Sequence, residues 1–273
     1  MIKADMHMHT IHCGHAKGSV QEMVEAAMKK GVETVGFAEH FPYPPDVPDL
    51  PGDSIASSES FKQYIQDVGI VQKKYSNRIH VLLGAEVDYH PQYMEWIRNQ
   101  LSRTHFDYLI GSVHLLDGKP IDFNQEYLNR LIQEIGGESD FWNQYWEAVH
   151  HLLDEPWLNV VGHLDLPRKF LSCDFAFSDQ SMIRKILQKI KHKDLAIDVN
   201  TSGIAKTTDQ QIYPAPIILR VAAVLDVDVM IGSDAHAPEE IGRAFESTRQ
   251  LLLSSGFSHY VTFEKGQKNY HYL

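Results

Sequence analysis

The 273-residue sequence contains few cysteines, few basic residues and no long apolar run. Its two cysteines, Cys13 and Cys173, are too few for a disulfide framework, so we expect reduced thiols in a cytosolic protein. No stretch approaches the roughly 18 apolar residues of a membrane span, and the opening MIKADMHMHT lacks the apolar core of a signal peptide. These absences predict a soluble cytoplasmic protein with no membrane partner.

Positive charge is also scarce, because 25 Lys and Arg residues face 36 Asp and Glu residues, which gives a net charge of -11. Binding to nucleic acid depends largely on Lys and Arg contacts to the phosphate backbone, so we expect no nucleic-acid partner. The negative charge does not exclude a small anionic substrate, because bound divalent cations would dominate the electric field around it.

Short apolar segments alternate with longer segments of helical periodicity along the whole chain. The predicted strands cover residues 2–6, 34–38, 80–85, 108–112, 158–161, 195–199 and 227–231. The predicted helices cover 59–75, 91–102, 126–135, 140–153, 179–191, 214–224 and 241–254, after a first helix that begins at a Ser19–Glu22 capping box and ends at Gly31. Such alternation indicates parallel βα units in one domain, 1–273, as either a closed barrel or an open doubly wound sheet.

A polar residue that can bind metal or hydrogen-bond a ligand stands at the C-terminal end of every predicted strand. In order, these residues are His7 and His9, Glu39 and His40, Glu86, His114, His163 with Asp165 beyond it, Asn200, and Asp234 with His236. The strand ends of a barrel converge on one face, whereas those of an open sheet lie in a row. A shared site therefore favours the barrel.

Imidazole and carboxylate groups together suit zinc, iron or manganese better than calcium or magnesium. Alternate residues of a strand face the same side, so His7 and His9 can bind one ion. A single zinc-type ion takes three or four protein ligands, and the candidates exceed that number. We therefore expect two or three ions, with a carboxylate such as Glu86 bridging two, and clustered ions of this kind suit phosphoester hydrolysis. Two nearby residues are not expected to bind metal. We expect His12 to be a solvated histidine and Cys13 to be a small buried thiol.

The motifs HMH, CGHA, AEH, GAE, GSVH, GH and SDAH, in this order, resemble those of the PHP family of metal-dependent phosphoesterases. The resemblance extends from His7 to His236. Longer stretches resemble the histidinol-phosphate phosphatase branch of that family: FAEHFPYP, GSVHLLDGKPIDF, GHLDLPRKF, and IDVNTSG followed by IYPAP.

The resemblance implies a distorted (β/α)7 barrel of the TIM type with a three-metal site at the C-terminal ends of its strands. Carried over by position, the first ion would be held by His7, His9, Glu86 and Asp234, the second by Glu86, His114 and His163, and the third by His15, His40 and His236. A metal-bridging hydroxide held by Glu86 and Asp234 would be the nucleophile. The implied reaction is hydrolysis of L-histidinol phosphate, a small phosphate monoester, to L-histidinol and phosphate in histidine biosynthesis.

Phosphate recognition should use a guanidinium, whose forked N–H groups match the geometry of a phosphate, and Arg168 is the first candidate. A surface salt bridge is an equally good interpretation of Arg168. The branch often has arginine where this chain has Ala205, so Lys206 is expected to reach the phosphate as a point charge instead. Asn200 and Ser202 are further candidate donors.

The substrate's ammonium or imidazolium would face Asp122 or Asp165. The Pro-rich segment 41–54 is expected to be a surface loop at the rim of the pocket. The sequence does not show whether this loop closes over the substrate. Two rival hypotheses stay open: the same chemistry on a nucleotide or sugar phosphate, and a noncatalytic metal-binding regulatory protein.

Overall fold

The computed structural model describes residues 1–45, 47, 57–172 and 180–273 of the chain, and it contains a barrel of parallel strands. Seven strands form one sheet in the order β1-β2-β3-β4-β7-β8-β9. They are β1 (Ala4–Asp5), β2 (Thr34–His40), β3 (His80–Asp88), β4 (Tyr108–Ser112), β7 (Val160–Val161), β8 (Ala196–Asn200) and β9 (Asp228–Gly232). Backbone hydrogen bonds close the ring, from Met6 N to Ile231 O at 2.9 Å and from Asp234 N to His7 O at 2.7 Å. The predicted barrel is confirmed, and the open sheet is excluded.

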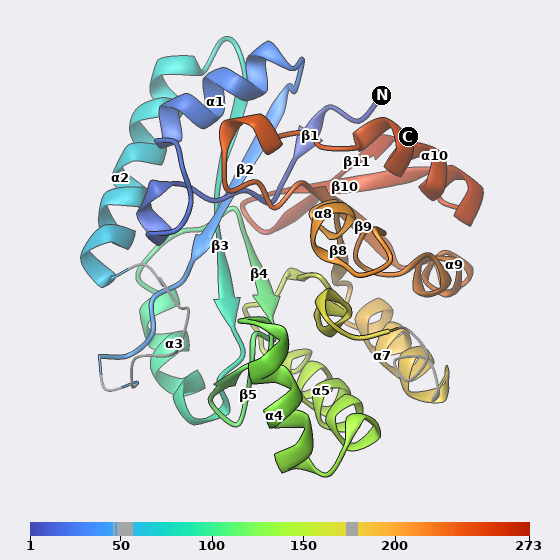
Figure 1. Ribbon diagram of the computed structural model, residues 1–273. Coiled ribbons are helices and arrows are strands. Elements are labelled where there is room, and N and C mark those ends of the chain that lie inside the picture. Colours follow the sequence, from blue (N-terminus) through green and yellow to red (C-terminus); the bar gives the residue numbers. More distant parts are fainter. Residues whose placement is uncertain (46, 48–56, 173–179) are drawn as a thin grey trace.

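Helices surround the strands (Figure 1). The α-helices are α1 (Val20–Lys29), α2 (Ser58–Tyr75), α3 (Met94–Leu101), α4 (Gln125–Ile135), α5 (Glu138–Leu152), α7 (Gln180–His192), α8 (Gly203–Lys206), α9 (Pro216–Val224) and α10 (Phe245–Ser255). Short 3-10 turns are η1 (Ile11–Cys13), η2 (Pro91–Tyr93), η3 (Leu166–Lys169) and η4 (Pro238–Glu240). The predicted capping box is present, because Ser19 N donates to Glu22 Oε2 and Glu22 N donates to Ser19 Oγ. None of the helices in the described parts of the chain is long and apolar enough to cross a membrane.

The interior of the barrel is filled with side chains, so only its ends can hold a site. Tyr108 crosses the interior and donates its hydroxyl to Met6 O at 2.7 Å. Glycines make this possible, because a Cβ on Gly36 would lie 2.3 Å from the Tyr108 hydroxyl and one on Gly84 would lie 2.7 Å from its ring. These two positions therefore admit no larger residue without displacing the tyrosine.

A C-terminal hairpin that the sequence reasoning missed covers the N-terminal end of the barrel. It pairs β10 (His259–Glu264) with β11 (Gln267–Tyr272) around Lys265 and Gly266, both at positive φ. Gly266 N donates to the backbone oxygen of Asp107, just before β4, and the Phe263 ring stacks on Tyr108. The Lys-Gly turn between alternating apolar residues was the available signal. With this end covered, the opposite face carries the site.

Several predicted boundaries were wrong. The last helix begins at Phe245 rather than 241, because Gly242 and Ala244 have φ of 66° and 54° and cannot continue a right-handed helix. A 3-10 turn and α3 divide the predicted helix 91–102, and β2 and β3 run on to His40 and Asp88. A second short hairpin, β5 (Leu115–Leu116) with β6 (Lys119–Pro120), was not predicted. Residue 179, the predicted start of the helix now seen as α7, lies outside the described residues.

Candidate metal centre

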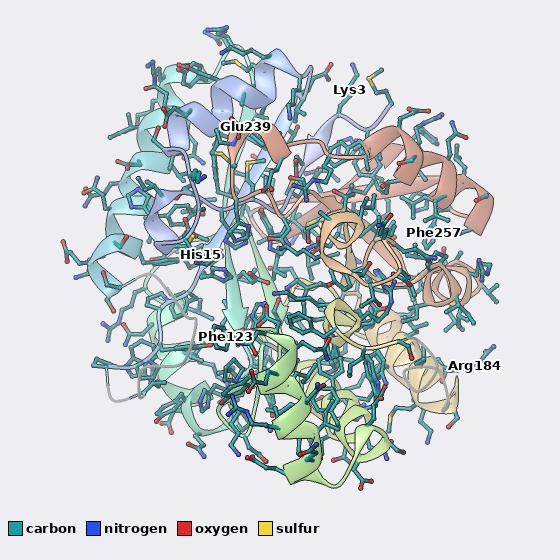
Figure 2. All side chains as sticks on the ribbon, in the orientation of Figure 1. Lys3, His15, Phe123, Arg184, Glu239 and Phe257 are labelled. Carbon is teal, nitrogen blue, oxygen red and sulfur yellow. The ribbon has the colours of Figure 1, made fainter. Side chains whose placement is uncertain are left out.

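The nine predicted metal ligands gather at the C-terminal ends of the strands. Together with Cys13, they form four groups, and within each group the potential ligand atoms lie within 4.8 Å of one another: His7, His9 and Asp234; Glu86, His114 and His163; His9, His40 and His236; and Cys13, His15 and His236. Figure 2 shows His15 and Phe123 on loops of this face. The ligand atoms come from six of the seven strands or the segments that follow them, all except β8, as the convergence of a barrel requires.

Glu86 lies at the centre of the cluster, with its two carboxylate oxygens facing different imidazoles. Oε1 lies 2.9 Å from His163 Nε2, whereas Oε2 lies 3.1 Å from His40 Nδ1 and 3.5 Å from His7 Nε2. Burial alone would raise its pKa, but the charges of His7 and His114 and nearby hydrogen bonds hold the pKa of Glu86 well below its usual range. A buried carboxylate that presents one oxygen to each side is suited to bridging two ions.

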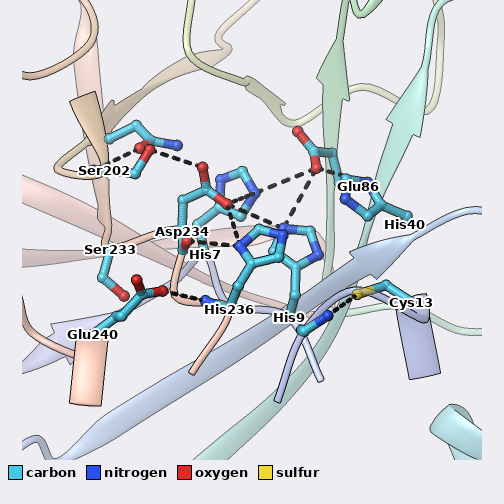
Figure 3. A network of polar contacts seen from close by, with 12 residues as sticks. His7, His9, Cys13, His40, Glu86, Ser202, Ser233, Asp234, His236 and Glu240 are labelled. Carbon is cyan, nitrogen blue, oxygen red and sulfur yellow. Dashed lines mark hydrogen bonds and ion pairs between the residues drawn. The ribbon is translucent and has the colours of Figure 1, made fainter. Parts of the chain in front are cut away.

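Asp234 faces Glu86 across the rings of His7 and His9 (Figure 3). Its Oδ1 lies 3.3 Å from His9 Nε2, and its Oδ2 accepts hydrogen bonds from Ser202 Oγ at 2.9 Å and Lys206 Nζ at 2.8 Å. Although burial opposes ionisation, Lys206 and the histidines keep the pKa of Asp234 well below its usual range. The carboxylate is therefore negative and ready to bind a cation.

His7 and His9 are turned so that one nitrogen of each ring points into the cluster. The Nδ1 atoms are held by buried carboxylates, His7 by Asp198 at 2.7 Å and His9 by Glu39 at 3.3 Å. Both Nε2 atoms are buried, and neither makes a hydrogen bond to any residue that the structure describes. Metal-binding histidines characteristically donate their other ring nitrogen to a carboxylate. The orphaned Nε2 atoms, beside Glu86 and Asp234, therefore fit a metal ion between them.

His114 and His163 oppose each other with their Nε2 atoms 3.2 Å apart, close to Glu86 Oε1. The Nδ1 of His114 is held by Asp88. Burial lowers the pKa of His114, but Asp88 and Glu86 outweigh it and raise the pKa to about 10. Two imidazole nitrogens and a carboxylate oxygen at this spacing can hold one zinc-type ion.

The third set lies at the rim of the site. His15 is exposed, and the side chains of His40 and His236 are 15% and 21% exposed. The rings of His15 and His236 stack at 4.8 Å. Burial and the nearby charge of His9 hold the pKa of His236 well below its usual range, so this imidazole is neutral and free to bind metal.

The geometry groups the rim residues differently from the resemblance, because Cys13 rather than His40 lies with His15 and His236. Cys13 is 1% exposed, and its sulfur accepts a hydrogen bond from Ala16 N at 3.3 Å. Burial raises the pKa of its thiol to about 12. These features agree with the predicted small buried thiol. His12, the other residue set aside, pairs with Asp67 of α2 at 2.9 Å.

A cavity of about 310 Å³ opens beside the cluster, and it contains only some of the predicted substrate contacts. Ser202 and Lys206 line it, and so does Asp122. Asn200 does not line it, but orders the wall by accepting from Ser202 N at 3.0 Å and donating to Asp198. Candidate phosphate donors therefore reach the cavity from the segment after β8.

Arg168 does not line the cavity, contrary to the position expected of a phosphate ligand. Its guanidinium is 1% exposed and donates to both oxygens of Asp209 at 2.8 Å and to Asp165 at 3.1 Å. The 3-10 turn η3 directs it away from the metal ligands, and the next residue, Lys169, lines the cavity instead. Asp165 is likewise buried, where it also accepts from Ala215 N.

Sequence reasoning missed the residues that support the ligands: Glu39 as a partner of His9, Asp88 as a partner of His114, and Asp198 as a partner of His7. Asp88 and Asp198 could have been found, because each stands two residues from a candidate on the same face of a strand, in GAEVD and IDVN. Part of the expected rim loop, residues 46 and 48–54, lies outside the described residues.

The PHP domain family model matches residues 5–202. A probable histidinol-phosphatase of Deinococcus radiodurans is 34% identical over 244 residues, covering 88% of this chain and 89% of that protein. The histidinol-phosphatase of Bacillus subtilis is 31% identical over 266 residues, covering 90% and 98%.

Two solved structures share the fold over nearly their whole length. A proposed histidinol phosphatase from Listeria monocytogenes superposes with a TM-score of 0.83 at 27% identity, covering 90% of this chain and 99% of that one. Histidinol phosphate phosphatase from Lactococcus lactis, in complex with zinc, L-histidinol and phosphate, superposes with a TM-score of 0.81 at 20% identity, covering 98% of each chain.

Proposed function

Because the chain belongs to the PHP family, in its histidinol-phosphatase branch, we propose that it hydrolyses L-histidinol phosphate to L-histidinol and phosphate. The observation that carries the proposal is the buried cluster in which the Nε2 atoms of His7 and His9 face Glu86 and Asp234 without a hydrogen bond among the described residues. The zinc, L-histidinol and phosphate bound by the Lactococcus lactis protein support both the metal and the substrate.

The cluster would hold two or three divalent ions, most simply three. The first two assignments follow the groups in the site: His7, His9, Glu86 and Asp234 for the first ion, and Glu86, His114 and His163 for the second. The third, His15, His40 and His236, follows the family resemblance. When bound, such ions lower the pKa of a water molecule and neutralise charge on the phosphate. Glu86 and Asp234 orient this chemistry by facing each other across the first group.

Lys206 and Ser202 would bind the phosphate from the side of β8. Both reach Asp234 Oδ2, so a phosphate bound beside Asp234 would lie within reach of an ammonium and a hydroxyl. Lys206 thereby supplies the positive charge that an arginine at position 205 often supplies in this branch. Arg168 remains only a distant candidate, since it pairs with Asp165 and Asp209 away from the cavity wall.

Asp122 would recognise the cationic amino end of the substrate. It lines the cavity without belonging to any of the ligand groups, and Lys169 Nζ anchors it through its backbone oxygen at 2.6 Å and its carboxylate at 3.1 Å. Lys169 and His114 outweigh the effect of burial and lower the pKa of Asp122, so the carboxylate is negative. A fixed negative charge in this wall favours a phosphate ester that also carries an ammonium.

A panel of phosphate monoesters tests the substrate. Zinc- or manganese-loaded protein should give a kcat/KM for L-histidinol phosphate at least about a hundredfold above those for p-nitrophenyl phosphate, a nucleoside monophosphate and a sugar phosphate, because only the first fits Asp122. Asp122→Asn should lower kcat/KM for L-histidinol phosphate about 10- to 100-fold and leave that for p-nitrophenyl phosphate unchanged. Faster hydrolysis of another ester than of L-histidinol phosphate would contradict the proposed substrate.

A further inference from the structure

Behind the second ligand group, a chain of contacts links His114 to the loop that follows β2. The Nδ1 of His114 meets Oδ1 of Asp88, which is 7% exposed and ends β3 two residues after Glu86. The other oxygen, Oδ2, accepts a hydrogen bond from the hydroxyl of Tyr43. The Asp88 carboxylate is thus held between a candidate metal ligand on one side and a tyrosine on the other.

We propose that Asp88 is a positioning residue for His114, and that Tyr43 holds Asp88 in place, so that Tyr43 tunes the metal affinity of the second group. An imidazole that donates Nδ1–H to a carboxylate keeps Nε2 unprotonated when it binds a cation. That Nε2 faces Glu86 Oε1 at 3.8 Å and His163 Nε2 at 3.2 Å. Asp88 therefore fixes both the tautomer and the direction of the ring.

Tyr43 can serve this purpose because its own ring is constrained. It is half-buried and meets the ring of His90 edge-on, with centroids 6.3 Å apart. His90 is 5% exposed and packs in turn against Tyr93 at 4.5 Å. A phenol packed in this way loses little further freedom when it donates to Asp88, so the hydrogen bond adds rigidity at the carboxylate.

The three residues also come from three successive strand ends. Tyr43 follows β2, Asp88 ends β3 and His114 follows β4. The parallel pairing of β2 with β3 and of β3 with β4 sets their spacing. A change at Tyr43 is therefore transmitted to the second group through one carboxylate rather than through a general loosening of the barrel.

The test measures metal affinity rather than activity. Cobalt is loaded into the unaltered protein and into Asp88→Asn, Tyr43→Phe and Tyr93→Phe, and each is titrated with a chelator while the visible cobalt spectrum is recorded. Tyr93→Phe is the matched control, because it removes a hydroxyl from the same aromatic cluster, and among the described residues that hydroxyl makes no hydrogen bond to Asp88.

Asp88→Asn should weaken one bound ion by about 10- to 100-fold. Tyr43→Phe should weaken the same ion by about 3- to 10-fold, the equivalent of one hydrogen bond, while Tyr93→Phe leaves it unchanged. Thermal melting of the metal-free variants identifies any variant that fails to fold. If Asp88→Asn fails to fold, the comparison of Tyr43→Phe with Tyr93→Phe still tests the proposal.

The inference rests on the metal centre of the proposed function, and the two can fail separately. If the unaltered protein binds no cobalt, the metal centre itself is wrong, and this inference falls with it. If the protein binds cobalt and folded Asp88→Asn holds every ion as tightly, only the role of Asp88 is overturned. Equal cobalt affinities in Tyr43→Phe and Tyr93→Phe would overturn the role of Tyr43.

Discussion

His7 and His9 on the buried side of the metal centre differ from His15 and His236 at its rim, although all four are proposed to bind metal. His7 and His9 are 0% exposed, and a carboxylate holds the Nδ1 of each ring. His15 is exposed, and the His236 side chain is 21% exposed. The barrel itself fixes the buried side chains, whereas packing constrains the rim side chains less.

The two sides also differ in charge. Burial disfavours a charged imidazole at His7, but Asp198 and Glu86 outweigh it and raise the pKa well above its usual value. At His236, burial and His9 act together and depress the pKa. Without metal, His7 therefore carries a proton where it would otherwise bind an ion, whereas His236 is neutral. The difference indicates that metal binding displaces a proton from His7 but not from His236.

The largest effect is expected at Asp234, which belongs to both sides. Its Oδ1 lies 3.3 Å from His9 Nε2 and 3.4 Å from His236 Nδ1. Asp234→Asn keeps the shape and removes the negative charge, so kcat/KM for L-histidinol phosphate should fall about a thousandfold. Phosphate release and elemental analysis measure activity and bound metal together. Unchanged phosphatase activity in this variant would favour the noncatalytic metal-binding alternative.

The next effect is the pH dependence of metal binding. A metal ion must displace the proton that His7 carries near neutral pH, because its pKa is raised. Zinc affinity of the buried side should therefore rise with pH from 6 to 8, about tenfold per pH unit for each proton displaced. His236 is already neutral in this range, so metal binding should displace no proton from its ring. Calorimetry in buffers of different ionisation enthalpy counts the protons, and release of none would remove the distinction between the sides.

A smaller effect is expected from the carboxylate behind His7. Asp198→Asn removes the charge that meets Nδ1 at 2.7 Å, and it should weaken zinc binding on the buried side about 10- to 100-fold. Asp67→Asn is a matched control, because Asp67 holds His12 at 2.9 Å outside the ligand groups. Competition with a chelator measures both. Equal affinities in the two variants would show that burial alone, without the carboxylate, orients His7.

The smallest effect is expected at His12, which lies in the same histidine-rich segment as His7, His9 and His15. It pairs with Asp67 and belongs to none of the ligand groups among the described residues. His12→Gln should change kcat/KM and metal content by less than about twofold, as for a substitution outside the site. A loss of metal in this variant would extend the rim set to His12.

Sequence reasoning predicted the barrel and the gathering of His7, Glu86 and Asp234, because strand periodicity and strand-end residues are local signals that a closed fold brings together. It did not predict the direction in which the Arg168 side chain points. Position in sequence does not say which way a short turn directs its side chains, and η3 directs Arg168 to Asp209 while Lys169 lines the cavity.

The residues that support the ligands likewise divide into those whose direction the sequence predicts and those whose contacts it does not predict. Asp88 and Asp198 lie on strands, where alternation gives their direction. The contact from Tyr43 to Asp88 joins two segments 45 residues apart and follows only from the packed structure. Contacts that depend on a loop's path cannot be read from local periodicity.

The central claim is that ions held by this cluster hydrolyse L-histidinol phosphate. Its most direct test is phosphate release from L-histidinol phosphate while metal-free protein is titrated with zinc or manganese and bound metal is counted at each step. We predict no release from the metal-free protein and a rate that rises with occupancy until two or three ions are bound. Release by the metal-free protein, or none by the fully loaded protein, would contradict the account.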